Sequence, residues 1–270
     1  MSAVQSNLSR APFDGIADAY DTTFTYSRIG QAQRALVWRV FCEAFAPGDR
    51  VLDLGCGTGV DACFLAERGV KVLGVDCSSE MIRVAKRRVS SCGKQASVEL
   101  DVLAIEQLKQ LKDRAPFDGL ISNFGALNCV EDLRGVARDL AALLRPGAAA
   151  FLCFLGPNCL WEIVWHMARG NQKKAFRRWR KAGTIARLAN GSELHVRYPN
   201  VQALSDTFAA DFTLKSWRGI GLAIPPSYVE PFATKFPPAI RFASRLDALF
   251  GRCPGVRGLA DHVLLEFVRN

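Results

Sequence analysis

Short apolar runs alternate with segments of helical periodicity over residues 50 to about 164. Each run ends in Gly, Asp or Asn and is followed by apolar residues at helical spacing, which is typical of βαβ units in a parallel sheet. The pattern predicts strands at 51–54, 71–75, 97–100, 119–122 and 149–154, with helices at 60–67, 79–89 and 133–144 between them.

The pattern differs on both sides of this region. Residues 30–45 predict a helix with Leu36 and Val40 on its buried face, which Pro47-Gly48 would end. We expect an α/β fold, with a Rossmann-like seven-stranded, mostly parallel sheet, helices on both faces, an antiparallel last strand and helical lid elements. After the fifth strand the sequence predicts one or two helices in 161–182, a proline-rich crossing at 225–238, and strands at 212–218 and 263–268.

The composition is that of a folded domain, since 49% of the 270 residues are hydrophobic and 23% are charged. Residues 1–11 lack an apolar run beside a basic segment, so we expect no secretory signal and a cytoplasmic protein. The apolar stretch 148–164 contains Gly156-Pro157-Asn158 and Glu162, which argues against a transmembrane segment. The nine cysteines include no Cys-x-x-Cys pair, so we predict neither a disulfide framework nor a metal site.

The net charge of +9 comes from one stretch of the chain. Eight basic residues and no acidic one lie between Glu162 and Glu193, so the remainder is close to neutral. We favour a solvated lid face for this stretch. The alternatives are a dock for an acidic substrate or carrier protein, and an interfacial helix anchored by Phe176 and Trp179. Binding to a membrane surface is therefore an alternative that we do not favour.

A glycine-rich turn follows the first predicted strand, in Val51-Leu52-Asp53-Leu54-Gly55-Cys56-Gly57-Thr58-Gly59. Glycines let the backbone turn sharply and let a ligand approach main-chain N–H groups. A dinucleotide fingerprint would need a glycine at the position of Val60, and Asp53 would repel a pyrophosphate. The turn therefore favours a cofactor with an ammonium group over NAD.

The second predicted strand ends in Gly74-Val75-Asp76, about twenty residues after the glycine turn. A carboxylate at this edge of the sheet can accept hydrogen bonds from both hydroxyls of a ribose. Capping of the next helix is the alternative role for Asp76. Because Ser78 and Ser79 can supply that cap, we favour ribose binding.

Taken together, 51–59, 74–76, Asp101-Val102 and Leu144-Arg145-Pro146-Gly147 resemble the motifs of class I S-adenosylmethionine-dependent methyltransferases. The closest likeness is to the type 11 group, which includes quinone-biosynthesis enzymes, and it covers about residues 13–154. The resemblance implies a methyltransferase that uses S-adenosyl-L-methionine and acts on a small-molecule acceptor. We divide the chain into an N-terminal helical flap (1–45), a cofactor-binding core (46–157), a lid insertion (158–200) and a C-terminal part of the core sheet (201–270).

The resemblance also implies roles for individual residues. The glycine turn would approach the methionine moiety, Met81 would pack on the adenine, and Asp101 would accept from the adenine amino group. Tyr20, Tyr26 and Arg34 are candidates for the carboxylate end, unless Tyr20 only packs and Arg34 lies at the surface. The predicted cofactor set is Tyr20, Arg34, Asp53, Gly55, Cys56, Gly57, Asp76, Cys77, Met81, Asp101, Val102, Asn123 and Phe124.

The acceptor side carries weaker signals. Trp161 and Trp165 are four residues apart and would share one helical face, either in the acceptor pocket or in the core. His166 is the candidate general base, and we expect structural roles for the other two histidines, His195 and His262. The predicted substrate-binding set is Tyr26, Trp161, Trp165 and Tyr198.

Two other functions stay open. An RNA methyltransferase ranks second, because arginines and aromatics interleave in the basic stretch. We do not expect a nucleic-acid partner, since no appended RNA-binding module is visible and the basicity is confined to one stretch. A non-catalytic S-adenosylmethionine-binding protein ranks third.

Overall fold

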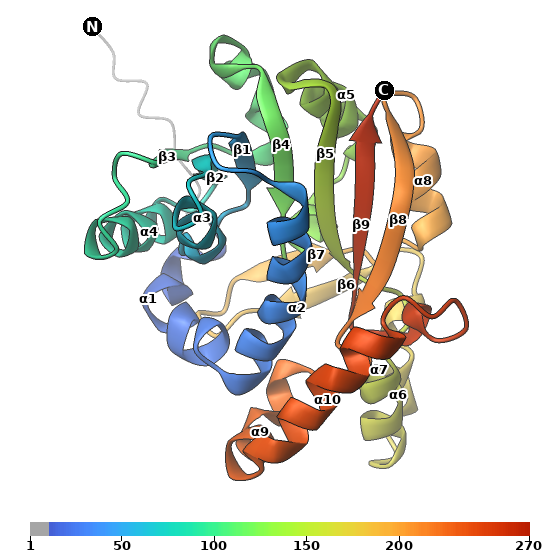
Figure 1. The fold of residues 1–270 in the computed structure, drawn as a ribbon. Coiled ribbons are helices and arrows are strands. Elements are labelled where there is room, and N and C mark those ends of the chain that lie inside the picture. The colour runs from blue at the N-terminus through green and yellow to red at the C-terminus, as the bar shows by residue number, and fades with distance from the viewer. Residues whose placement is uncertain (1–10) are drawn as a thin grey trace, which may run out of the picture.

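The computed structural model describes residues 11–270, which form a seven-stranded sheet in the order β3-β2-β1-β4-β5-β9-β8 (Figure 1). Only β9 runs antiparallel to its neighbours, β5 and β8. The predicted fold class, the seven strands and the antiparallel last strand are confirmed. The strands are β1 (Arg50–Leu54), β2 (Lys71–Asp76), β3 (Val98–Val102), β4 (Phe117–Ser122), β5 (Leu144–Leu155), β8 (Phe212–Ile220) and β9 (His262–Arg269).

Helices cover both faces because successive strand side chains point to opposite sides of the sheet. In β1, Val51 packs into one core cluster and Leu52 into the other, and both are fully buried. The face of Val51 is covered by α2 (Arg28–Ala44), α3 (Val60–Ala66) and α4 (Ser79–Ser91), and the face of Leu52 by η3 (Ile105–Arg114), α5 (Leu133–Leu143) and α8 (Val201–Phe208).

The starts of α2 and α4 are fixed by local side-chain caps. The hydroxyl oxygen of Ser27 accepts a hydrogen bond from the Gly30 N–H at the start of α2. Ser78 does the same for the Met81 N–H at the start of α4, at 3.1 Å. Such caps satisfy N–H groups that have no partner within the helix. Ser78, and not Asp76, is therefore the N-cap of α4.

The lid insertion differs from its prediction. It contains the expected helices as α6 (Leu160–Met167), α7 (Gln172–Ala175) and the single turn η5 (Arg177–Trp179). It also contains a hairpin that we did not predict, of β6 (Thr184–Arg187) and β7 (Glu193–Val196). Both strands are only four residues long and half exposed, so the alternation in Glu193-Leu194-His195-Val196 is too short to predict a strand by itself.

The proline-rich crossing expected at 225–238 is wrong. The chain there forms η6 (Ser227–Val229), α9 (Glu230–Lys235) and the start of α10 (Pro237–Phe250). Pro231 is the second residue of α9 and Pro237 the first of α10, and in the first turn of a helix the N–H that proline lacks would have no partner within the helix. Within the stretch predicted as a crossing, Pro231 and Pro237 therefore begin helices.

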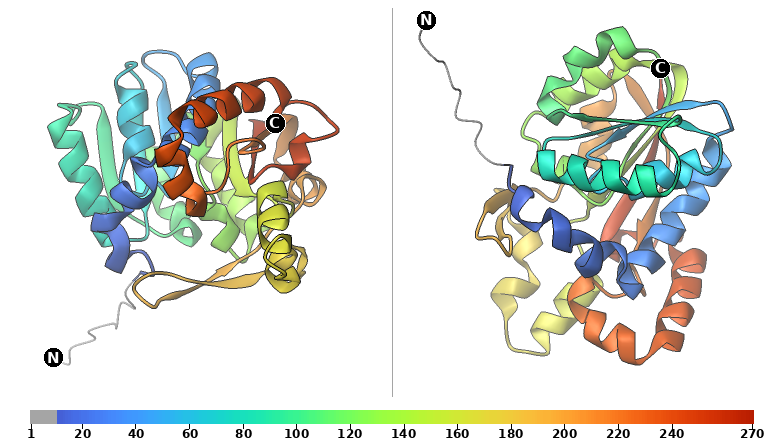
Figure 2. Two further views of the ribbon diagram at one scale, coloured as in Figure 1. Left: turned by 90° about the horizontal axis from the view of Figure 1, so that it is seen from below. Right: turned by 90° about the vertical axis from the view of Figure 1, so that its left-hand side faces the viewer.

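The N-terminal flap is described from residue 11 onward, as η1 (Asp14–Ile16), α1 (Ala17–Tyr20), η2 (Asp21–Thr25) and α2. Residues 1–10 of the predicted flap, and most of the stretch judged for a secretory signal, lie outside the described residues. Figure 2 shows α1 beside the β6–β7 hairpin at the carboxyl edge of the sheet. The Asn190 side chain in the hairpin turn donates a hydrogen bond to the carbonyl oxygen of Pro12, at 2.9 Å.

Among residues 11–270, no helix has the length and apolar character needed to cross a bilayer.

Candidate active site

The glycine turn between β1 and α3 presents bare backbone to a cavity. Gly57 has a φ of +53°, and nothing lies within 4 Å of where its Cβ would stand. Gly55 has a φ of +72°, and a Cβ there would collide with the side chain of Ala126. Both positions need glycine for their backbone conformation, and Gly55 needs it also for its close packing.

Asp76 organises this turn from the end of β2. One carboxylate oxygen accepts from the Gly57 N–H and the other from the Ser78 N–H, each at 2.9 Å. Burial raises the pKa of Asp76, while these two N–H groups lower it, and the balance lies above the ordinary value. The carboxylate lines the cavity with lone pairs to spare for a ligand.

The cavity has a volume of about 240 Å³ and a mostly apolar lining. Parts of it come from the core, from the N-terminal flap and from the β6–β7 hairpin, so three distant stretches of sequence meet there. We refer to it as the apolar cavity. Eight residues of the predicted cofactor set line it: Tyr20, Gly55, Gly57, Asp76, Cys77, Met81, Asn123 and Phe124.

Five residues of the predicted cofactor set lie elsewhere. Asp101 pairs with Arg114 at 3.3 Å, and the side chain of Val102 is exposed. The Cys56 side chain packs toward Gly74, so only its backbone belongs to the turn. Asp53 and Arg34 are buried below the cavity lining. Their placement does not test any role toward a cofactor, so these roles stay predictions.

Arg34 takes part in a buried network beneath the apolar cavity. Its guanidinium donates to Asp61 at 2.6 Å, and the same carboxylate accepts from the indole of Trp38 and the amide of Asn123. Arg34 is only 7% exposed, so the alternative that it lies at the surface is wrong. The network joins α2, α3 and the end of β4.

Asp53 is buried below the glycine turn, and its Oδ2 has no hydrogen-bond partner among the described residues. Burial, and then the negative charge of Asp61, raise the pKa of Asp53 well above its ordinary value. A cationic ligand that donates a hydrogen bond to Oδ2 would stabilise the ionised carboxylate.

Sequence reasoning missed the apolar residues that complete the cavity wall. They come from the flap, from the loops after β3 and β4, from the end of β5 and from the hairpin. The alternation in Glu193-Leu194-His195-Val196 could have indicated a strand with Leu194 and Val196 on one face, but nothing local places that strand at the site. The missed residues are Pro12, Phe13, Ile105, Gly125, Ala126, Cys129, Leu155, Leu194 and Val196.

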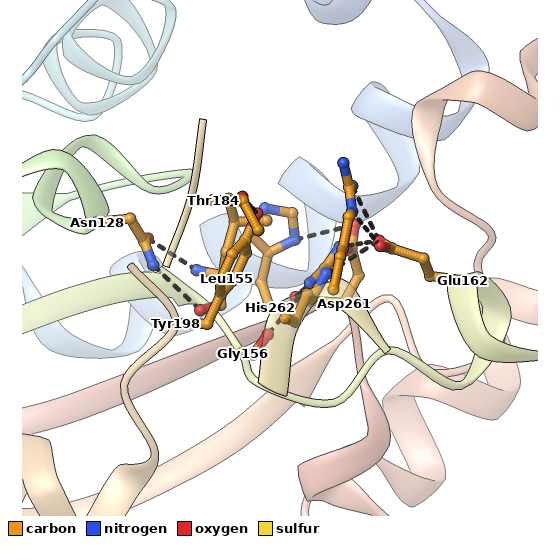
Figure 3. Close-up of polar contacts among 10 residues, drawn as sticks. Asn128, Leu155, Gly156, Glu162, Thr184, Tyr198, Asp261 and His262 are labelled. Carbon is orange, nitrogen blue, oxygen red and sulfur yellow. Dashed lines mark hydrogen bonds and ion pairs between the residues drawn. The ribbon is translucent and has the colours of Figure 1, made fainter. Parts of the chain in front are cut away.

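A second cavity of about 370 Å³ adjoins the first, and both are bordered by Tyr20, Phe124 and Leu155. We refer to it as the polar cavity. Charged and hydroxyl side chains of the lid, of η6 and of the start of β9 line its other side, and Figure 3 shows Glu162, Asp261 and His262 among them. They include Glu162, Arg177, Arg178, Tyr228, Asp261 and His262.

Arg178 holds the polar cavity together. It donates to Glu162 at 2.9 Å, to the Asp261 carboxylate at 2.6 Å and to the carbonyl oxygens of Gly156 and Asp261. Burial lowers its pKa, but Asp261 and neighbouring groups raise it above the ordinary value. The side chain is 7% exposed, so the prediction of a solvated lid face is wrong for Arg178. Arg177, which also pairs with Glu162, is half-buried.

His262 lies next to this ion-pair network. Its Nδ1 is 3.4 Å from an Asp261 carboxylate oxygen and makes no hydrogen bond within the described chain. The ring packs edge-on against Phe124, with 5.4 Å between ring centroids. Burial lowers the pKa of His262, against the opposing effect of Asp261. The imidazole is therefore neutral at neutral pH and borders the polar cavity.

His166, the candidate base from sequence, does not line either cavity. Its ring lies 6.2 Å from that of Tyr228, near the outside of the lid, and partial burial lowers its pKa. His195 lies on the hairpin, where its ring contacts the Ala182 carbonyl oxygen. The catalytic role of His166 stays a prediction.

The predicted substrate residues surround the two cavities without lining them. The Trp161 indole donates to the Ala223 carbonyl oxygen at 3.1 Å, and Trp165 packs on Tyr228. Tyr26 is exposed. Tyr198 packs against Arg178, 5.3 Å from ring centroid to guanidinium. Their roles in substrate binding stay predictions. Among residues 11–270, no group of three side chains is placed to hold a metal ion.

The comparisons with known proteins agree with this geometry. The model of a methyltransferase domain matches residues 51–147. A 2-phytyl-1,4-naphtoquinone methyltransferase of Nostoc sp. is 30% identical over 213 residues, which cover 75% of this chain and 84% of the relative. The chain belongs to the class I S-adenosylmethionine-dependent methyltransferases.

Other relatives of this methyltransferase align over less of their length. A demethylmenaquinone methyltransferase of Clavibacter sepedonicus is 33% identical over 56% of this chain, and a tRNA 5-carboxymethoxyuridine methyltransferase of Escherichia coli is 32% identical over 59%. In both cases the alignment spans 61% of the relative. The CcbJ methyltransferase structure from Streptomyces caelestis has the same fold, with a TM-score of 0.62 at 17% identity, covering 96% of this chain and 97% of that one.

The cofactor of this family, S-adenosyl-L-methionine, fits the apolar cavity on three observations. The bare backbone at Gly57 leaves room for close approach, and the Asp76 carboxylate faces the cavity. Asp53 is buried below the turn and does not line the cavity, so its role toward an ammonium group stays a prediction. The aromatic and apolar wall from the flap and hairpin suits the remainder of the cofactor.

Proposed function

We propose that the methyltransferase transfers a methyl group from S-adenosylmethionine to a small-molecule acceptor that binds in the polar cavity. The observation that carries this proposal is the shared border of the two cavities at Tyr20, Phe124 and Leu155. A cofactor held on the glycine side and an acceptor held on the lid side would meet at these three side chains. Such positioning is the main contribution that a protein makes to this kind of displacement.

The cofactor, when bound, supplies a methyl group activated by a sulfonium. We propose that His262 removes the proton from a hydroxyl or phenol acceptor. Its ring borders the polar cavity, and its low pKa keeps it able to accept a proton at neutral pH. Asp261, 3.4 Å from Nδ1, would orient the ring and stabilise the imidazolium that forms. This geometry favours His262 over His166.

A nucleic-acid acceptor is the second candidate function. One relative is a tRNA methyltransferase, and the lid contains interleaved basic and aromatic residues. The ion-paired wall of the polar cavity favours a small acceptor over a polynucleotide, since Arg177 and Arg178 are both engaged by Glu162.

Calorimetric titration with S-adenosylhomocysteine, with NAD as the control ligand, tests the cofactor half of the proposal. We expect micromolar binding of the first and none of the second. Transfer of labelled methyl to a panel of phenols, quinols and hydroxylated small molecules, with unmodified tRNA included, tests the other half. Transfer to tRNA alone would replace the small-molecule proposal, and tight binding without any transfer would indicate a binding protein.

A further inference from the structure

Exposed apolar side chains gather in two segments at one end of the molecule. These are residues 160–182, from α6 to the turn after η5, and residues 226–252, from η6 to the end of α10. The two segments are a small part of the described chain, yet they contribute ten of its thirteen exposed large hydrophobic residues. The ten are Leu160, Val164, Met167, Trp179, Tyr228, Phe232, Phe236, Phe242, Leu249 and Phe250.

Helix α10 shows that this exposure is organised. Ile240 and Asp247 lie seven residues apart on its buried face, which packs against α2. Phe242 and Leu249, also seven apart, lie on the outward face and are 62% and 72% exposed. Arg245 lies on the same outward side. The helix therefore has one buried face toward α2 and a second, apolar stripe toward solvent.

Helices α6 and α9 repeat this arrangement. Leu160, Val164 and Met167 follow helical spacing on the exposed side of α6, while Glu162 is turned inward. On α9 the exposed rings of Phe232 and Phe236 pack against each other, with 4.9 Å between centroids. Three helices thus present apolar stripes outward.

All exposed charges on the two segments are positive. Both segments lie wholly within the described residues, and their only acidic residues are Glu162, Glu230 and Asp247. Glu162 and Asp247 are buried, and Glu230 accepts hydrogen bonds from the N–H groups of Arg28 and Ile29. The exposed basic residues are Arg169, Lys173, Lys174, Arg180, Lys181, Lys235, Arg241, Arg245 and Arg252.

The two segments form one surface. In Figure 1, α6, α7, α9 and α10 stand together at the same end of the molecule, and the views of Figure 2 agree. Trp165 of α6 packs on Tyr228 of η6, with 5.9 Å between ring centroids. Tyr228 and Arg177 also line the polar cavity, so this surface adjoins the acceptor side of the site.

We propose that this surface, residues 160–182 with 226–252, binds the interface of an anionic lipid membrane. Aromatic and aliphatic tips on separate helices can each enter the headgroup region, while the basic residues between them attract the negative lipid surface. An acidic protein would satisfy the charges but would need a shaped apolar groove for ten dispersed side chains. The charge alone would suit RNA, but the aliphatic side chains of α6 and α10 would gain nothing from it.

Vesicle flotation with the full chain tests the proposal. We expect the protein to float with vesicles of phosphatidylcholine containing about one third phosphatidylglycerol, and to float far less with phosphatidylcholine alone. Lys173→Glu with Lys174→Glu should weaken binding to the anionic vesicles by at least about tenfold. Phe242→Ser with Leu249→Ser should weaken it to a similar extent, with little change in its dependence on salt.

The matched control is Lys86→Glu with Lys112→Glu, which changes the net charge equally at exposed positions of α4 and η3. We expect it to float like the wild type. Affinity for S-adenosylhomocysteine, unchanged in all variants that fold, keeps this test separate from the proposed function. Three results would overturn the proposal. They are equal flotation with both vesicle types, an equal loss of flotation in the control, and binding to tRNA but not to vesicles.

Discussion

The two cavities lie side by side, but the chain builds them in different ways. The apolar cavity uses backbone, with glycines that expose N–H groups and one carboxylate, Asp76, that fixes the turn. The polar cavity uses long side chains from the lid and from β9, joined through Arg178. The glycine turn of the apolar cavity is a short local motif, whereas the ion-pair network of the polar cavity joins residues more than eighty positions apart.

This difference predicts which part of the site tolerates substitution, because backbone shapes the cofactor side and individual side chains shape the acceptor side. A backbone turn accepts one kind of ligand and depends little on the surrounding side chains. An ion-paired wall can be altered by a single substitution, because each member depends on the others. The comparison predicts that variants on the lid side affect stability and turnover, while variants on the glycine side affect cofactor affinity.

The largest effect is expected for Arg178→Met. Removing the guanidinium leaves the buried Asp261 carboxylate without its cationic partner, which should lower the free energy of unfolding by about 3–5 kcal/mol. Urea unfolding followed by tryptophan fluorescence measures this. The control is Arg187→Met, whose pair with Glu193 is exposed and should be worth less than about 1 kcal/mol. Similar losses in the two variants would remove the proposed difference between the cavities.

His262→Gln tests the chemistry of the polar cavity. We expect turnover to fall about a thousandfold, with unchanged affinity for S-adenosylhomocysteine. Only the neutral imidazole can accept a proton, and burial holds its pKa below the ordinary 6.5. Wild-type turnover should therefore rise with pH through a limb below 6.5 and stay level above it, and the variant should lack this limb. His166→Gln is the comparison, and a larger loss there would return the role of base to His166.

Asp76→Ala tests the glycine side. We expect about a hundredfold weaker binding of S-adenosylhomocysteine, because the carboxylate faces the cavity and holds the Gly57 N–H in place. Circular dichroism should show a retained fold, since the residue lies at the sheet edge. Asp113→Ala, at an exposed position of η3, is the control. Unchanged affinity in Asp76→Ala would exclude the ribose assignment.

The smallest effect is expected in the hairpin. Leu194→Ala removes part of the wall of the apolar cavity and should weaken S-adenosylhomocysteine binding about fivefold. Ile185→Ala, on the paired strand, removes a side chain that is exposed and does not line the cavity. Calorimetry on both variants would show whether the hairpin contributes to binding through contact, and equal affinities would show that it does not.

The sequence predicted the glycine side well because its signals are local. Asp76, Met81 and the glycine turn lie in motifs whose spacing fixes their position at the edge of a parallel sheet. The seven strands were also predicted, because most of them contain an apolar run, whereas β3 and β8 mix apolar with polar residues. Asp61 was not anticipated as the partner of Arg34, because buried ion pairs between distant residues leave no periodic trace.

The lid side was predicted poorly for the same physical reason. Nothing local distinguishes Arg178, which turns inward, from Arg180, which is exposed two residues later. Choosing between them needs the position of Asp261, which is more than eighty residues away. Likewise His262 borders the polar cavity only because β9 inserts between β5 and β8, which brings the start of that strand to the site.

The buried side chain of Asn128 has a mechanical consequence. Its amide donates to the carbonyl oxygens of Leu155 and Arg197, and its side-chain oxygen accepts from the Leu155 N–H. One end of the hairpin is thereby fixed to the sheet, whereas its turn is held to the flap by the hydrogen bond from Asn190 to Pro12. Because each hydrogen bond is worth about 1 kcal/mol, separating the hairpin turn from the flap costs far less than separating the hairpin base from the sheet. The hairpin is thus firmly attached at the strand ends, and its more weakly held turn faces the N-terminal flap.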